Sequence, residues 1–127
     1  METSRKTPKC EFVAHGTFVR ATYTAGAHIN GEDAQEHLRI LAELAGGKKV
    51  GVLVDLRNVA SQDRAARAAY AGEESLAFTR RCALLIGSPM ARVIGSFFLG
   101  INKPLYPTRL FTSLKEAEAW VAAEGDS

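Results

Sequence analysis

The feature that most constrains the fold is a continuous apolar run at residues 50–56, VGVLVDL. The run is rich in valine, and no polar residue interrupts it before Asp55. This pattern is typical of a strand that helices cover on both faces, as in parallel sheets. Beyond Asp55 a polar loop leads into a helix start, and open α/β sheets place ligand or partner sites at such carboxyl ends of strands. The run therefore predicts a fold class and the location of a site.

Periodicity in the rest of the chain predicts alternating helices and strands. Residues 11–23 alternate apolar and polar side chains around His15 and Gly16, which predicts an antiparallel hairpin. Gly72 is expected to split or bend the second helix. We expect one α/β domain with the order ββαβαβαβα, a mixed five-stranded sheet and four to five helices. The expected helices cover residues 32–45, 63–78, 90–101 and 114–123, and the further strands cover residues 50–56, 82–86 and 109–111.

Length and charge limit the number of domains and the kinds of partner. A chain of 127 residues is long enough for one domain with a real core. We expect residues 1–9 and 124–127 to be disordered tails on a domain of residues 10–123, because both ends are polar. Sixteen basic and fourteen acidic side chains give a formal net charge of +2, which does not favour nucleic acid as a partner. An electrostatic partner site must then be a local patch.

The cysteines and the apolar runs indicate where the protein is found. Cys10 and Cys82 have no neighbours at metal-ligand spacing, so neither a disulfide nor a zinc site is predicted. Residues 1–9 are polar and basic, unlike a signal segment, and the apolar runs are too short to span a bilayer. We therefore expect a cytoplasmic protein without a membrane span, a metal or a cofactor.

Several segments resemble those of a known family. Residues 52–67, VLVDLRNVASQDRAAR, are similar to the strand, loop, aspartate and helix start of STAS-type domains. These domains occur in bacterial anti-sigma-factor antagonists and in the cytoplasmic tails of sulfate transporters. Residues 83–89, 97–104 and 111–120 are similar to segments of uncharacterised bacterial STAS-like or lipid-transfer-like proteins. The resemblance implies a STAS-like fold and a non-enzymatic module for protein interaction and regulation.

The resemblance also implies where a phosphorylation switch would lie. STAS-type antagonists carry an aspartate followed by a phosphorylatable serine at a helix start. Asp63 matches the aspartate, and Arg64 occupies the position of the serine. Arginine provides no hydroxyl for a phosphate, so the familiar switch is not expected here. Ser61 is the nearest hydroxyl, and it is interpreted either as the cap of the following helix or as a phosphorylation site.

The polar residues beyond the central strand form the candidate site for a partner or an anion. Arg57, Arg64 and Arg67 are expected to converge beside Asp55 and Asp63. An arginine in a first helical turn opposes the helix dipole, so it needs a carboxylate or an anionic partner. A surface pair between Asp63 and Arg67, worth about 0.3–0.5 kcal/mol, is the simpler alternative. The full candidate set is Asp55, Arg57, Asn58, Ser61, Asp63, Arg64, Arg67 and Ser88.

The expected helix at residues 90–101 carries more apolar surface than one core-facing stripe needs. Three explanations remain open, because large apolar patches are seldom left bare. The surplus could form a homodimer contact, could pack entirely in the core, or could bind a small apolar, lipid-like ligand. The candidate face consists of Met90, Val93, Phe97 and Phe98.

Three functional hypotheses follow from these residues. The first is a non-enzymatic interaction module that binds an unknown protein partner through residues 55–67. The second is a small carrier or sensor for an apolar or anionic ligand. The third, an enzyme with Asp55 or Asp63 as general base, lacks a nucleophile or metal cluster beside them. His15, His28 and His37 form no recognisable catalytic set, and we predict no catalytic residue.

Overall fold

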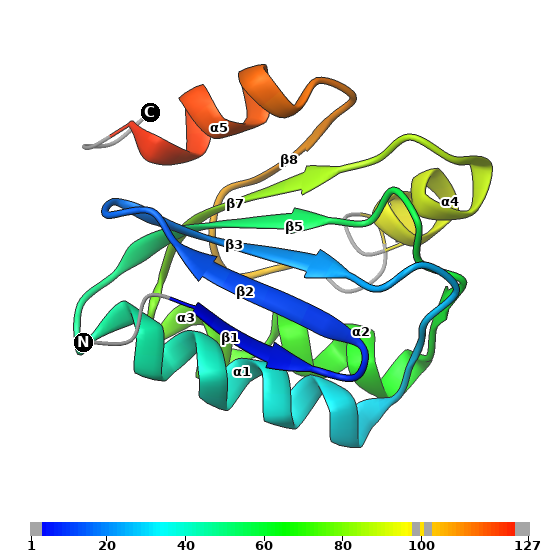
Figure 1. The fold of residues 1–127 in the computed structure, drawn as a ribbon, viewed down its shortest axis with the longest axis horizontal. Coiled ribbons are helices and arrows are strands. Elements are labelled where there is room, and N and C mark those ends of the chain that lie inside the picture. Colours follow the sequence, from blue (N-terminus) through cyan, green and yellow to red (C-terminus); the bar gives the residue numbers. More distant parts are fainter. Residues whose placement is uncertain (1–3, 98–99, 101–102, 124–127) are drawn as a thin grey trace.

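A computed structural model describes residues 4–97, 100 and 103–123, and its elements surround one mixed sheet (Figure 1). Within these residues the sheet has six strands in the order β1-β2-β3-β5-β7-β8, and β4 pairs in parallel with β6. The strands are β1 (Ser4–Thr7), β2 (Cys10–Ala14), β3 (Phe18–Tyr23), β4 (His28–Ile29), β5 (Val50–Asp55), β6 (Ser61–Gln62), β7 (Thr79–Leu85) and β8 (Thr108–Phe111). The helices are α1 (Gly31–Ala45), α2 (Arg64–Ala71), α3 (Glu73–Leu76), α4 (Pro89–Phe97) and α5 (Leu114–Ala122).

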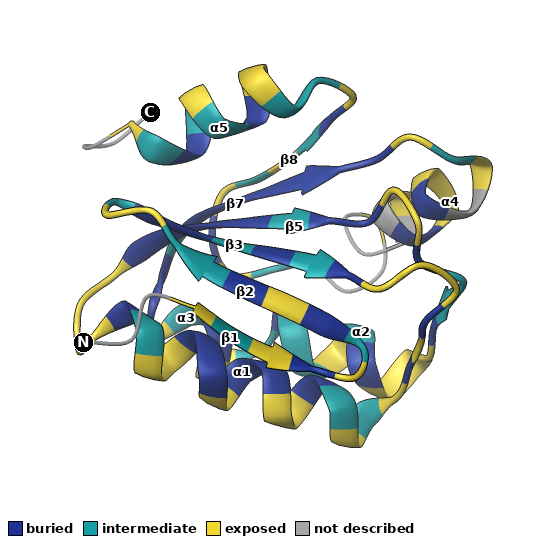
Figure 2. Ribbon diagram, viewed as in Figure 1, coloured by how far each residue is buried: buried dark blue, intermediate teal, exposed yellow. Residues whose placement is uncertain are grey.

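The centre of the sheet confirms the prediction from residues 50–56. β5 lies between β3 and β7, is parallel to both, and buries every residue except the half-buried Val54 (Figure 2). β2 and β3 form the predicted antiparallel hairpin, and β8 extends the sheet in parallel beside β7. The chain therefore has the predicted mixed α/β architecture.

The first strand corrects both the five-stranded sheet and the tail predicted at residues 1–9. Ser4–Thr7 pairs antiparallel with β2, with Arg5 opposite Phe12. The Arg5 guanidinium also donates to Glu43 Oε1 of α1 at 2.6 Å. An edge strand needs no apolar alternation when one face and one edge remain in water, so periodicity missed it. The second predicted tail, residues 124–127, lies outside the described residues.

Helices cover the two faces of the sheet unequally. α1, α2 and α3 lie on one face, where they enclose the larger core (Figure 1). α5 covers β5, β7 and β8 on the other face. α4 lies beyond the carboxyl ends of β5 and β7. Within the described residues, no helix is both long and apolar enough to cross a membrane.

α5 approaches the sheet closely because β5 has a glycine beneath it. A Cβ atom built on Gly51 would lie 2.2 Å from the carbonyl oxygen of Val121 and 2.7 Å from its Cγ2. Val121 is fully buried there, and the Trp120 ring packs beside Phe111 of β8 with centroids 5.6 Å apart. The absence of a side chain at Gly51 therefore sets the distance between helix and sheet.

The second helix starts at a different residue than predicted. Asp63, rather than Ser61, caps α2, and its Oδ1 accepts a hydrogen bond from Ala66 N at 2.8 Å. Ser61 instead belongs to β6, and its Oγ lies 2.6 Å from His28 Nδ1. The helix splits at Gly72 as expected, because this residue has an extended backbone between α2 and α3.

The cap at Asp63 can be tested against Ser61. Asp63→Ala should lower the free energy of unfolding by about 1 kcal/mol, because the amide of Ala66 loses its acceptor. Ser61→Ala should change it by less than about 0.5 kcal/mol, since its partner His28 is exposed. Urea denaturation of both variants measures the difference. Equal losses would contradict the assignment of the cap.

α4 covers only part of the predicted helix at residues 90–101. It begins after Ser88, whose Oγ caps the helix by accepting a hydrogen bond from Ala91 N at 3.0 Å. Its described residues end at Phe97, and residues 98, 99, 101 and 102 lie outside the described part of the chain. The predicted final helix begins as expected, with Ser113 accepting a hydrogen bond from Glu116 N at 3.3 Å.

Candidate functional site

Asp55 ends β5 with a carboxylate that two arginines hold. Its side chain is 3% exposed. Arg57 donates from Nε to Oδ1 at 3.0 Å and from Nη2 to Oδ2 at 2.8 Å, and its backbone amide adds a bond to Oδ1 at 3.1 Å. Arg20 of β3 donates to Oδ2 from the neighbouring strand at 3.3 Å. The carboxylate is therefore fixed in position by one planar guanidinium and reached by a second.

These contacts decide the ionisation of Asp55. Burial opposes the charged form, but the hydrogen bonds and charge of Arg57, with the hydrogen bond of Arg20, outweigh it and hold the pKa below the usual 3.8. The same carboxylate raises the pKa of Arg57. A general base works best with a pKa near the operating pH, so this carboxylate is poorly suited to accept a proton. The arrangement favours a structural role for Asp55 within a positively charged surface.

An open hollow of about 490 Å³ lies next to Arg57. The stem of Arg57 packs against one residue that lines it, because a Cβ atom on Gly87 would lie only 3.0 Å from Arg57 Cγ. We call this region the carboxyl-end hollow, since it follows β7 and β8. It is lined by Ile86, Gly87, Ser88, Pro89, Arg92 and Thr112.

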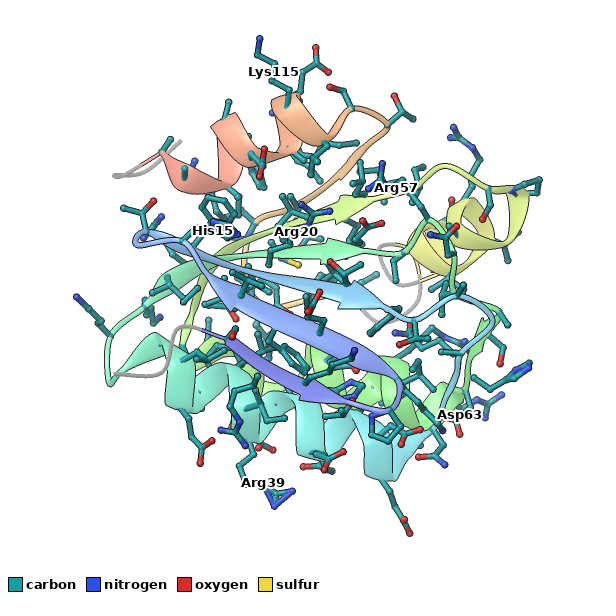
Figure 3. All side chains as sticks on the ribbon, in the orientation of Figure 1. His15, Arg20, Arg39, Arg57, Asp63 and Lys115 are labelled. Atoms are coloured by element: carbon teal, nitrogen blue, oxygen red, sulfur yellow. The ribbon has the colours of Figure 1, made fainter. Side chains whose placement is uncertain are left out.

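The predicted polar residues divide between two places. Arg57 lies toward the α5 side of the sheet, whereas Asp63 lies at the start of α2 (Figure 3). Arg64 is exposed in the first turn of α2, and Arg67 donates to the carbonyl of Gln62. The structure thus brings Asp55 and Arg57 together near the hollow that Ser88 lines, and it places the other two arginines elsewhere.

Asn58 is exposed, and its backbone carbonyl accepts a hydrogen bond from Gly26 N at 2.9 Å.

Sequence reasoning missed Arg20, which belongs to the site through strand pairing. It also missed Arg92, which lies one helical turn after Ser88. The backbone amide of Arg92 donates a hydrogen bond to the carbonyl oxygen of Ser88 at 3.0 Å. In the sequence, only the spacing of four residues between Ser88 and Arg92 indicated that Arg92 would lie beside Ser88.

The predicted apolar face on α4 is described only in part. Val93 is 47% exposed, whereas Ile94 is buried in the larger core. The side chains of Met90 and Phe97 and the whole of Phe98 lie outside what the structure describes. The homodimer and ligand alternatives for this face therefore remain predictions.

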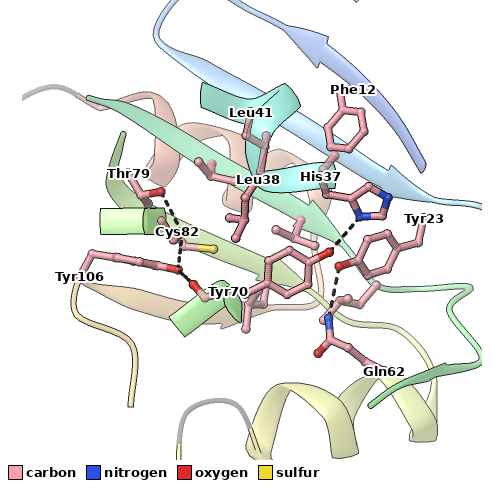
Figure 4. Close-up of a pocket in the computed structure, with 16 residues that line it drawn as sticks. Phe12, Tyr23, His37, Leu38, Leu41, Gln62, Tyr70, Thr79, Cys82 and Tyr106 are labelled. Atoms are coloured by element: carbon pink, nitrogen blue, oxygen red, sulfur yellow. Dashed lines mark hydrogen bonds between the residues drawn. The ribbon is translucent and has the colours of Figure 1, made fainter. Parts of the chain in front are cut away.

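A second site, which sequence reasoning missed, lies between the sheet and α1, α2 and α3. Tyr70 of α2 and His37 of α1 meet there, with the Tyr70 hydroxyl 2.9 Å from His37 Nδ1 (Figure 4). Gln62 Nε2 donates to the hydroxyl of Tyr23 at 3.2 Å. The Tyr106 hydroxyl donates to the carbonyl of Tyr70 at 2.6 Å. Polar side chains from several elements thus meet within an apolar core.

The remaining histidines and the cysteines show no catalytic arrangement among the described residues. The His15 ring stacks on Phe18 with centroids 4.9 Å apart. Burial raises the pKa of Cys82 to about 12, so its thiol is protonated and unreactive at neutral pH. No group of three His, Cys, Asp or Glu side chains in the described part of the chain is placed to hold a metal ion.

Comparisons with known proteins agree with this fold. A family model described as a domain of unknown function, DUF7793, matches residues 12–123. A crystal structure of an uncharacterised DUF3478 protein with a SpoIIAA-like fold, from Shewanella loihica PV-4, is 16% identical with a TM-score of 0.56. That match covers 93% of this chain and 90% of the other, and it confirms the STAS-like fold prediction.

A protein with unknown function from Arthrobacter sp. FB24 is 34% identical, with a TM-score of 0.35. The match covers 89% of this chain and 99% of that protein. The comparison with curated proteins found no match.

Proposed function

The chain belongs to the DUF7793 family, and from its own geometry we propose that it is a non-enzymatic interaction module that binds an acidic segment of a partner protein. The proposed docking surface is the carboxyl-end hollow together with Arg57. The single observation that carries this proposal is an open hollow that Arg92 lines, whose lining contains no carboxylate and whose Gly87 packs against the aliphatic stem of Arg57. Such a surface attracts anionic groups, carboxylates among them.

The charge around the hollow supports an anionic partner. Arg92 lines the hollow, and nearby Arg57 shares the carboxylate of Asp55 with Arg20, so these described residues carry a surplus of positive charge. The side chain of Arg57 is 41% exposed, which leaves part of its guanidinium open to a second carboxylate. A guanidinium presents five N–H donors in a planar fork, which suits bidentate binding of carboxylates.

The shape of the hollow favours a peptide segment over an enclosed small molecule. It is open to solvent, and Ser88, Arg92 and Thr112 offer side-chain donors along its wall. Small-molecule sites usually bury most of their ligand in a concave and largely apolar pocket. An extended acidic segment can instead place successive carboxylates on Arg57 and Arg92.

Two finer features complete the proposal. We place the domain in the cytoplasm, in keeping with Cys10 and Cys82, which are both buried and free. A homodimer contact through Met90, Val93, Phe97 and Phe98 remains part of the proposal. Residues 10–123 are proposed as the bounds of the STAS-like domain, with β1 added as its edge strand.

Affinity capture with matched variants tests the docking surface. Arg92→Glu reverses one charge at the hollow, and Arg39→Glu makes the same change on the exposed side of α1 (Figure 3). Wild type and Arg39→Glu should recover the same partner from lysate, and Arg92→Glu should lose it. Both variants should keep the wild-type melting temperature, because both side chains are exposed. Equal recovery by all three proteins would refute the proposed surface.

A further inference from the structure

The second site encloses a cavity of about 40 Å³ between the sheet and the helices (Figure 4). At roughly 10–15 Å³ for each water molecule, this volume has room for about three waters. Its apolar walls come from both layers of the fold. They are formed by Phe12, Ala21, Leu38, Leu41, Val52, Val54, Leu56 and Leu84.

The polar groups that line the cavity are all uncharged. Burial raises the pKa of Tyr70 and of Tyr106, and burial lowers the pKa of His37 below its usual 6.5. No Asp, Glu, Lys or Arg is among the lining residues of the described chain. An ion would lose its hydration there without a counter-charge, so the cavity selects against charged molecules.

The lining also has unused hydrogen-bonding capacity. His37 is 2% exposed, and among the described residues its Nε2 has no hydrogen-bond partner. The hydroxyls of Ser75 and Tyr106 lie 3.1 Å apart, and each can still accept a further bond. Polar groups are costly in a core, where leucine or phenylalanine would fill the same space without that cost. Their concentration around one cavity indicates recognition of a polar group rather than packing alone.

Tyr70 has a special position at this cavity. It lies in the last turn of α2, directly before the break at Gly72, and its side chain is only half-buried. Its ring lies against the apolar walls while its hydroxyl bonds His37 Nδ1. Only rotation of this ring toward solvent, with loss of its bond to His37, would enlarge the cavity by the volume of a phenol ring.

We propose that the cavity binds a compact, uncharged molecule that joins a hydroxyl group to an apolar ring, and that the Tyr70 ring competes with it for the same walls. The hydroxyl of such a molecule replaces that of Tyr70 beside His37. Its ring contacts the same leucine and valine side chains. Phenol is the simplest probe with this chemistry, because it is the side-chain group of Tyr70 itself.

The test is a titration of the full chain with phenol at neutral pH, followed by amide chemical shifts in two-dimensional NMR. Wild type should show saturable shifts confined to the cavity, at His37, Leu38 and Cys82. Benzoate, a ring of similar size with a negative charge, should bind at least about tenfold more weakly. Tyr70→Ala removes the competing ring, so it should bind phenol about tenfold more tightly than wild type.

Two results would overturn the inference. One is an absence of saturable shifts in wild type, even if Tyr70→Ala binds phenol, because the site would then exist only in the variant. The other is equal binding of benzoate and phenol. If Tyr70→Ala does not fold, Ala21→Val replaces it, since the added methyl groups fill the cavity from β3. That variant should weaken phenol binding by about tenfold, and unchanged binding would also refute the site.

Discussion

Replacing Asp55 with asparagine is expected to lower the free energy of unfolding by about 2–3 kcal/mol. The change removes the charge that holds Arg57 and Arg20 while it keeps the size of the side chain. Breaking a fully buried ion pair costs about 3–5 kcal/mol. We expect a smaller loss for Asp55→Asn because the side chain of Arg57 is 41% exposed, so water can hydrate it in the variant. Denaturant titration at neutral pH measures the loss.

The pH dependence of this loss has a definite sign. The folded pKa of Asp55 lies below 3.8, so its charge stabilises the folded state fully only above the unfolded pKa. That contribution disappears as the pH falls through the lower, folded pKa, and the difference between wild type and Asp55→Asn should shrink over this range. Glu43→Gln, in an exposed pair with Arg5, is the control and should cost less than about 0.5 kcal/mol. Equal losses in the two variants would contradict the account of Asp55.

Replacing Gly51 with alanine is expected to cost about 3 kcal/mol. The added Cβ atom would lie 2.2 Å from the carbonyl oxygen of Val121 and must push α5 away from the sheet. The obstacle is backbone, so no side-chain rotation can relieve the contact. Thermal unfolding measures the loss, which should lower the melting temperature by roughly 10 °C or more.

Gly72→Ala is the matched control for this substitution. A Cβ atom there would meet the carbonyl oxygens of Ala68 and Ala69 at 3.5 Å, which is ordinary contact, and its backbone φ of −88° suits alanine. We expect a change of less than about 0.5 kcal/mol. A Gly51→Ala protein as stable as Gly72→Ala would show that α5 can shift freely on the sheet.

The helices and buried strands could be predicted from local patterns, whereas β1 could not. The continuous apolar run at residues 50–56 and the helical periodicity of residues 32–45 both indicate burial directly. β1 is a polar edge strand held by backbone pairing and by the bond from Arg5 to Glu43. Pairing of this kind leaves no apolar pattern in the sequence. The cap of α2 was misplaced for a related reason, since Ser61 and Asp63 are both good capping residues and only the backbone of β6 decides between them.

Only some residues of the candidate site at the carboxyl end of β5 could be predicted from the sequence. Arg57 lies in the loop after Asp55 and binds its carboxylate, whereas Arg64 and Arg67 belong to α2 and lie away from Asp55. Nearness along the chain was therefore a poor guide once a helix began. Arg20 joins the site from β3 across the sheet, and this pairing depends on strand register rather than on spacing.

The central claim is that the carboxyl-end hollow binds acidic peptide, and an NMR titration with hexaglutamate tests it most directly. Amide shifts should concentrate at Ser88, Arg92 and Thr112, and added salt should weaken the binding. Arg92→Glu should weaken it by about tenfold, whereas Arg39→Glu should leave it close to wild type. Shifts spread evenly over the basic surface, or an equal loss in both variants, would contradict the claim.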